Sequence, residues 1–292
     1  MTVNTLSERA MLASLNIRRW QATLTDKEIT AEVASNHAVS EKRAGRYRKY
    51  AIDVEAPAFK AVTAAASELR TAHYFYTLPW GQDGSRILTT AIFDEYSKQM
   101  RTHRQAFDAA VKAFVEAYPR LKSAARVELN GMYKERDYPA NIAAKFGVDI
   151  VFMPMPDAED FRATLPDDLV TDIKRNIQSE LDRTTQLAMR EPYERLYEHI
   201  SRMVNRRSDS KAVFRDTLVT GLADLCAILP GLNLTRDPQL EDLRKRAERM
   251  IADVNPQDLR DVPATRNRVA RKAAEIQHLM ADFMGAASSE AA

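Results

Sequence analysis

Ten residues near the N-terminus gather the side chains best suited to contact a phosphate backbone. Residues 41–50 read Glu-Lys-Arg-Ala-Gly-Arg-Tyr-Arg-Lys-Tyr and hold five cations and two tyrosines. If this segment is helical, one face carries Lys42, Arg43, Arg46 and Lys49, a geometry that can follow a line of phosphates. Tyr47 and Tyr50 could then stack on bases. The same pattern would also suit a solvated helix face whose tyrosines pack inward.

A second candidate is a break between two helical stretches. Residues 77–88 read Thr-Leu-Pro-Trp-Gly-Gln-Asp-Gly-Ser-Arg-Ile-Leu and contain two of the eight glycines and one of the two tryptophans. As structure, Asp83-Gly84 is a good hairpin turn and Trp80 anchors the core. As function, the loop presents Trp80 and Arg86 to a partner. We keep both interpretations and add these two residues as auxiliary nucleic-acid contacts.

Signatures of established enzyme chemistry are missing from the sequence. The five histidines show no paired ligand spacing, and there is no Gly-x-x-x-x-Gly-Lys phosphate loop or Gly-x-Ser-x-Gly elbow. One acidic stretch could hold a hard cation, but its carboxylates are better placed as helix-start residues. It comprises Asp157, Glu159, Asp160, Asp167 and Asp168. We therefore expect no catalytic, cofactor-binding or metal-binding residues, while an enzyme with an unrecognised site stays open.

Composition sets broader limits. The 292 residues carry 43 basic and 41 acidic side chains, a formal net charge of +2, so a case for nucleic acid must rest on local clustering. Cys226 is the single cysteine, which excludes an intramolecular disulfide. Neither a signal peptide nor a run of about 18 apolar residues is visible. These features predict a soluble, cytoplasmic protein that does not contact a membrane.

Hydrophobic periodicity predicts a mainly α protein with a minor β element. From residue 166 onward, apolar residues recur at helical spacing, with a kink or restart at Glu191-Pro192 and a helix end at Pro230-Gly231. In residues 240–254 and 269–283, apolar residues recur at alternating spacings of three and four, so each helix has a narrow apolar face, called a three-four seam here. Such seams favour long antiparallel helices in a bundle, with a homo-oligomer as the expected state. In the N-terminal half, Thr25 to Glu28 fits a capping box that opens a helix.

Short strands are predicted beside these helices, in a small sheet or ribbon within the N-terminal half. The candidates are residues 15–20, 86–89 and 148–153. Prolines crowd the stretch from 154 to 166, so we predict a domain boundary there. The predicted organisation is a mixed domain over 10–156, a helical domain over 166–284 and a disordered tail over 285–292.

Several pieces of the chain together resemble an uncharacterised family encoded by tailed phages and prophages. They begin with His73-Tyr74 and the Thr77-Leu78-Pro79-Trp80-x3-Gly84-x-Arg86-Ile87-Leu88 segment. They continue with Phe114-x3-Tyr118, Asp137-Tyr138-Pro139, Phe146, Pro154-x-Pro156 and Asp160-Phe161-Arg162. The similarity covers about residues 10 to 205 and is carried by the combination of pieces. It implies a phage context and a non-structural gene product that works beside DNA-transaction proteins or a chaperone-like ATPase, and it supplies no catalytic residues.

Two functions fit these observations. The first is a non-enzymatic protein that associates with nucleic acid in DNA transactions, including single-strand binding. Its expected contacts are Lys42, Arg43, Arg46, Tyr47, Lys49, Trp80 and Arg86. The second is a helical adaptor or scaffold that oligomerises or docks on a protein partner such as a chaperone-like ATPase, without nucleic-acid contact. Near-neutral net charge and the three-four seams favour the second.

Overall fold

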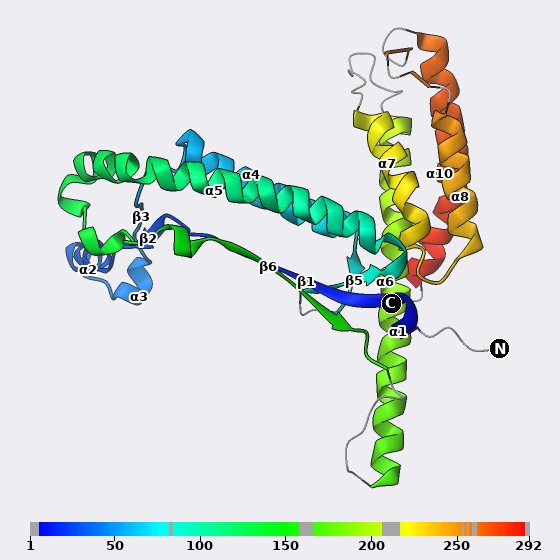
Figure 1. The fold of residues 1–292 in the computed structure, drawn as a ribbon, viewed down its shortest axis with the longest axis horizontal. Coiled ribbons are helices and arrows are strands. Elements are labelled where there is room, and N and C mark those ends of the chain that lie inside the picture. The colour runs from blue at the N-terminus through cyan, green and yellow to red at the C-terminus, as the bar shows by residue number, and fades with distance from the viewer. Residues whose placement is uncertain are drawn as a thin grey trace. The chain divides into compact units, whose positions relative to one another are not determined.

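The fold is mainly helical with a small antiparallel sheet, as the sequence predicted (Figure 1). The computed structural model describes residues 6–81, 84–157, 166–205, 217–252, 254–255, 257–258 and 262–289. Of these, the side chains of residues 205, 217 and 282–289 lie outside the description. Gln82, Asp83, Glu159, Asp160, Phe161 and Arg162, all singled out from the sequence, also fall outside it.

The helices vary in length from 4 residues in α1 to 39 residues in α6. They are α1 (Leu6–Arg9), α2 (Lys27–Asn36), α3 (Glu41–Ala44), α4 (Pro57–Phe75), α5 (Phe93–Leu129), α6 (Asp167–Asn205), α7 (Thr217–Leu232), α8 (Pro238–Ile251) and α10 (Pro263–Ser289). Short 3₁₀ turns are η1 (Thr90–Ile92), η2 (Asn130–Met132), η3 (Glu135–Asp137) and η4 (Ala143–Lys145). The strands are β1 (Ala10–Arg18), β2 (Thr23–Thr25), β3 (Arg48–Tyr50), β4 (Leu78–Pro79), β5 (Ser85–Thr89) and β6 (Gly147–Pro154).

The chain divides into two compact units that interleave along the sequence. Unit 1 comprises Met1–Ser14, Tyr76–Glu95 and Phe152–Ala292, whereas unit 2 comprises Leu15–Phe75 and Tyr96–Val151. The sequence predicted two consecutive domains separated near the prolines after residue 154. The difference arises because β1, α5 and β6 each pass from one unit into the other, and pairing between such distant segments leaves no local sequence signal.

Unit 1 joins strands to a helical bundle. β5 pairs antiparallel with β1 from Ala10↔Thr89 to Ser14↔Ser85, and with β4 on its other side. β4 and β5 therefore form the hairpin that the Asp83-Gly84 pair predicted, and the sheet order is β4-β5-β1-β6. α6, α7, α8 and α10 pack together (Figure 1). Their seams are buried inside this bundle: Leu240, Leu243, Ala247 and Met250 from α8, and Val269, Ala273, Ile276 and Met280 from α10.

Three local expectations in the helical half need correction. α6 continues through Pro192, so the predicted restart does not occur. A proline removes one backbone hydrogen bond, and burial of Tyr193 and Leu196 directly after it holds the helix in place. α7 likewise extends two residues beyond Pro230, to Leu232. α10 extends to Ser289, into residues that were predicted to form the disordered tail.

Unit 2 is organised around an aromatic core between α4 and α5. Phe114 is fully buried, with ring centroids 5.5 Å from Phe59, 6.4 Å from Trp20 and 5.5 Å from Phe146. α4 and α5 lie side by side (Figure 1), and a hydrogen bond of 2.9 Å between His73 Nδ1 and the Tyr96 hydroxyl also joins them. A second, two-stranded ribbon pairs β2 with β3, from Thr23↔Tyr50 to Thr25↔Arg48. This ribbon was not predicted.

No helix within the described part of the chain is both long enough and apolar enough to cross a membrane.

The aromatic core gives a direct stability test. Phe114→Ala removes a fully buried ring and leaves a cavity, so we expect unit 2 to lose about 3–5 kcal/mol of stability. Urea unfolding followed by tryptophan fluorescence in a Trp80→Phe background measures the change, because Trp20 is then the one tryptophan left and its ring lies 6.4 Å from Phe114. Val127→Ala on the same helix is the control, since Val127 is 80% exposed and its loss should change stability little. Equal effects of the two substitutions would contradict this account of the core.

Candidate nucleic-acid interface

The basic segment 41–50 is not one helix, which corrects the face predicted for its four cations. α3 ends after a single turn at Ala44, and Gly45 then adopts a φ of 86°. This left-handed conformation suits glycine and ends the helix. The chain continues into β3, whose neighbour is β2. Lys42 and Arg43 therefore belong to a helical turn, Arg46 to a connection and Lys49 to a strand.

Strand geometry divides the cations at the end of this segment. Successive side chains of a strand point to opposite sides. In β3, Arg48 and Tyr50 are exposed while Lys49 between them is buried. Lys49 therefore points away from solvent and from any polyanion there. The exposed cations and tyrosines of the segment are Lys42, Arg43, Arg46, Tyr47, Arg48 and Tyr50, and Glu41 is exposed beside them.

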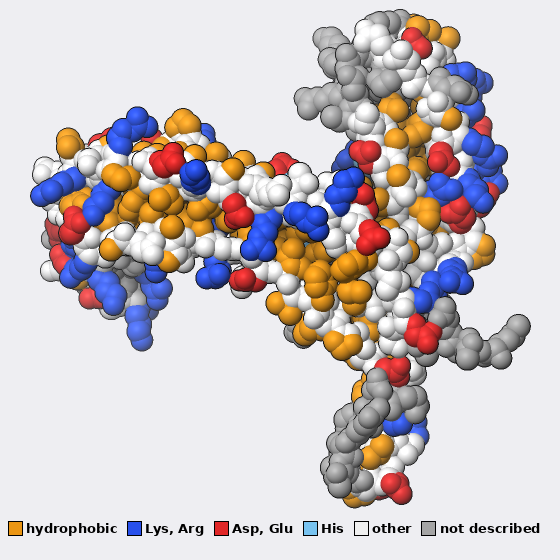
Figure 2. All heavy atoms as spheres, in the orientation of Figure 1, with side chains coloured by type: hydrophobic (Ala, Val, Ile, Leu, Met, Phe, Trp, Pro, Cys, Tyr) orange, Lys and Arg blue, Asp and Glu red, His pale blue; other side chains and the backbone are white. Residues whose placement is uncertain are grey.

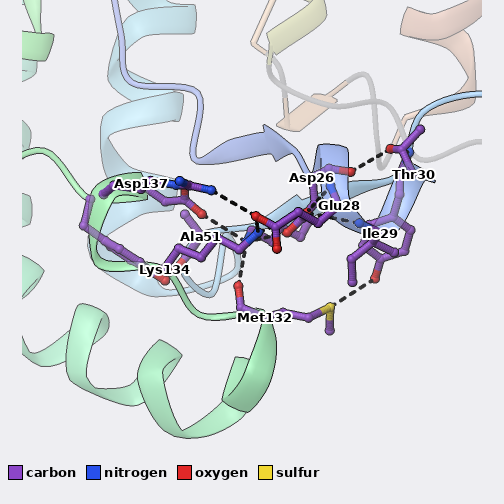
Figure 3. A network of polar contacts seen from close by, with 12 residues as sticks. Asp26, Glu28, Ile29, Thr30, Ala51, Met132, Lys134 and Asp137 are labelled. Atoms are coloured by element: carbon purple, nitrogen blue, oxygen red, sulfur yellow. Dashed lines mark hydrogen bonds and ion pairs between the residues drawn. The ribbon is translucent and has the colours of Figure 1, made fainter. Parts of the chain in front are cut away.

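Lys49 instead joins an internal network around Asp26. Figure 3 shows this network, with Asp26, Met132 and Asp137 labelled. Its ammonium lies 2.8 Å from Asp26 Oδ2 and 3.0 Å from Asp137 Oδ2, and it donates to the Met132 carbonyl at 2.6 Å. An ammonium has three donor hydrogens, so these three partners satisfy it fully. The side chains of Lys49 and Asp26 are 4% and 2% exposed. The structure thus removes Lys49 from the residues available to nucleic acid.

Asp26 connects the segments around this pair. Its Oδ1 caps α2 by accepting hydrogen bonds from the backbone N–H groups of Glu28 at 3.1 Å and Ile29 at 3.4 Å. Asp26, rather than Thr25 of the predicted capping box, is therefore the N-cap residue. Lys134 lies 3.4 Å from the same oxygen and 2.9 Å from Glu28 Oε1. One carboxylate holds together the start of α2, strand β3 and the η2–η3 connection.

The electrostatics agree with a charged, stable pair. The hydrogen bond from Lys49 lowers the pKa of Asp26 to about 2, against the opposing effect of burial. Burial alone would lower the pKa of Lys49, but its bonds to Asp26 and Asp137 outweigh burial and raise it. Both groups are therefore charged throughout the physiological pH range.

Next to this network lies an open pocket with a basic lining. It has a volume of about 780 Å³ and is lined by Thr25, Lys27, Thr30, Glu41, Lys42, Gly45 and Arg46. Three of the four charged side chains are cations. Within the described residues, none of these three has a carboxylate within ion-pair distance. Figure 2 shows basic side chains gathered at the end of unit 2 that holds α2 and α3. This end of unit 2, the pocket with Arg43, Tyr47, Arg48 and Tyr50, is called the basic end below.

The sequence missed Lys27 as a member of this site. It lies in the first turn of α2, where the helix dipole disfavours a positive charge. This unfavourable position is the sequence feature that could have identified Lys27 as a candidate site residue. Folding brings it beside Lys42 and Arg46, and no periodicity connects these positions.

Trp80 and Arg86, the other two predicted contacts, belong to unit 1. Trp80 is half-buried and follows β4, in the turn region of the β4–β5 hairpin. Arg86 donates to the Thr77 hydroxyl at 2.8 Å and to the Thr77 carbonyl at 3.0 Å. It also pairs with Glu191 at 3.0 Å, with 12% of its side chain exposed. These bonds give Arg86 a structural role that fastens the hairpin to α6, so we remove it from the contact residues.

Among the described residues, no group of three histidine, cysteine or acidic side chains is arranged to hold a metal ion. Comparisons with models of known protein families, with curated proteins and with solved structures found no match. The resemblance to a phage-encoded family therefore stays a prediction.

The Asp26–Lys49 pair should control the acid stability of unit 2. Asp26→Asn leaves a buried ammonium with one carboxylate instead of two, so we expect a loss of about 3 kcal/mol at neutral pH. Folding lowers the pKa of Asp26 from 3.8 to about 2, so its contribution is complete above pH 4 and disappears as the pH falls toward 2. The difference between the two proteins should shrink over the same range.

Urea unfolding at a series of pH values measures this difference. Glu32→Gln is the control, because Glu32 is exposed on the same helix. If Asp26→Asn is as stable as the natural protein at pH 7, the pair does not organise this region.

Proposed function

We propose that the protein associates with nucleic acid through the basic end of unit 2, as a non-enzymatic component of DNA transactions in a phage or prophage context. The observation that carries the proposal is the pocket lined by Lys27, Lys42 and Arg46, three cations without a carboxylate partner among the described residues. Cations that are not neutralised internally are free to replace the counterions of a phosphate backbone.

Two features of the surrounding surface support single-stranded nucleic acid. Arg43 and Arg48 are exposed and extend the positive charge beyond the pocket. Tyr47 and Tyr50 are 40% and 59% exposed. Exposed aromatic rings beside a positive surface allow bases to stack while cations hold the backbone, and stacking requires bases that are not paired in a duplex.

The basic end should set the salt dependence of binding. The triple variant Lys42→Gln/Arg43→Gln/Arg46→Gln removes three phosphate contacts, so the slope of log K against log salt for single strands should fall by about 2. Fluorescence anisotropy with labelled single- and double-stranded DNA and RNA at several salt concentrations measures the slope. Lys42, Arg43 and Arg46 are exposed and have no carboxylate within ion-pair distance among the described residues, so their loss should leave stability unchanged.

A matched control changes the same net charge elsewhere. Arg175→Gln/Arg183→Gln/Arg202→Gln removes three exposed arginines of α6 that pair with carboxylates on their own helix. This control should keep the natural slope. An equal decrease in both variants would show a general charge effect and would reject the basic end as the binding site.

The tyrosines should affect strand preference rather than salt dependence. Tyr50→Ala removes an exposed ring without removing charge, and loss of one stacking contact should weaken single-strand binding by about 1–3 kcal/mol. Binding to duplex DNA and the salt slope should stay the same. Competition between single- and double-stranded DNA measures the preference, and Tyr74→Ala, at a 47% exposed tyrosine of α4, is the control.

A second candidate function, the helical adaptor, is favoured by one observation. The first turns of α6 carry Leu169, which is 47% exposed, and the half-buried Ile173 and Ile177 at helical spacing. An apolar stripe of this kind could dock on a protein partner or on a second copy. The seams of α8 and α10 no longer support this function, because they pack inside unit 1. Light scattering separates the candidates, since a monomer at high concentration would argue against the adaptor.

A further inference from the structure

Unit 1 contains a second positive pocket, unconnected with the proposed nucleic-acid contacts. It has a volume of about 350 Å³ and is lined by Glu8, Arg9, Thr89, Thr90, Ala91, Pro230, Gly231, Asn233, Leu234 and Arg236. All of these residues belong to unit 1. The volume lies at the lower end of the range, about 300–1,000 Å³, that is usual for sites of small ligands.

The two arginines of this pocket lack an internal counter-charge. Within the described residues, no carboxylate lies within ion-pair distance of Arg9 or Arg236. Glu8 also lines the pocket, so two positive charges face one exposed negative charge. Burial and the nearby charge of Arg236 lower the pKa of Arg9, as expected where like charges lie close together.

The walls of the pocket are fixed by hydrogen bonds between three segments and within the turn before α8. The Thr89 hydroxyl donates to the Gly231 carbonyl at 2.6 Å, and the Thr90 hydroxyl donates to the Arg9 carbonyl at 3.2 Å. Asn233 closes the turn before α8 by accepting from the Asp237 N–H at 2.7 Å and donating to the Asp237 carbonyl at 2.8 Å. These polar groups are therefore engaged, and the guanidinium groups are the donors left for a ligand.

The backbone conformation of Arg236 also supports a binding role for this pocket. Arg236 has a φ of 58°, a left-handed conformation that favours glycine and asparagine. An arginine there costs backbone energy that a glycine would avoid, although it is exposed and forms no ion pair within the described residues. Strain retained at a cavity is more common where the side chain has a binding role.

We propose that Arg9 and Arg236 bind the phosphate group of a small phosphomonoester in this pocket. Two guanidinium forks match the charge and the several acceptor oxygens of a phosphate dianion, whereas a carboxylate would need only one of them. The apolar wall formed by Ala91, Pro230 and Leu234 accommodates the organic part of the ligand.

Calorimetric titration with glycerol 3-phosphate, against glycerol at matched ionic strength, tests the proposal on the full chain. The natural protein binds the phosphate ester and does not bind glycerol. Arg236→Gly removes one guanidinium while glycine fits the φ of 58°, so the fold is retained and binding weakens about tenfold or more. Arg9→Gln gives the same loss, and Arg175→Gln on α6, a matched loss of one arginine, leaves binding unchanged.

No binding to the natural protein would overturn the proposal, and so would undiminished binding to Arg236→Gly or to Arg9→Gln. The triple variant of the basic end separates this site from the nucleic-acid site. It should bind glycerol 3-phosphate normally, and loss of binding there would place the phosphate in unit 2 and reject Arg9 and Arg236 as its ligands.

Discussion

The buried ion pair between Asp26 and Lys49 is the interaction on which the basic end of unit 2 depends. Two charges withdrawn from water are tolerated only when each has enough partners. Here the ammonium has two carboxylates and a carbonyl, and the Asp26 carboxylate has an ammonium, two backbone N–H groups and Lys134 nearby. This requirement fixes β3 against α2 and thereby determines which neighbouring cations face solvent.

Fixing one lysine inside has a consequence for the rest of the segment. Because β3 alternates, burying Lys49 exposes Arg48 and Tyr50 on the opposite side. The turn at Gly45 then redirects the chain, so that Lys42 and Arg46 line one pocket with Lys27 of α2. Lys49 thus has a structural role inside unit 2, whereas the other cations of the segment face the solvent.

The sequence revealed most of the elements and few of their long-range contacts. Strands at 86–89 and 148–153 and the long helices were predicted, because their periodicity is local. The helix predicted for residues 41–50 was wrong, because the helical spacing of the cations cannot show that Gly45 ends the helix after one turn. Lys49 could not be distinguished from Lys42, because its partners Asp26 and Asp137 are distant in sequence. Arg86 was misplaced for the same reason, since Glu191 lies 105 positions away.

The net charge does not show which cations of this protein are neutralised, whereas the ion pairs between cations and carboxylates do. Basic and acidic residues nearly balance overall, but they are paired unequally. Arg183, Arg190 and Arg246 of the unit 1 helices each have a carboxylate three or four residues away. Such exposed pairs add little stability, but they cancel the local field. Lys27, Lys42 and Arg46 have no carboxylate within ion-pair distance in the described chain, so no ion pair cancels their charges at the basic end, although the whole protein carries a formal charge of only +2.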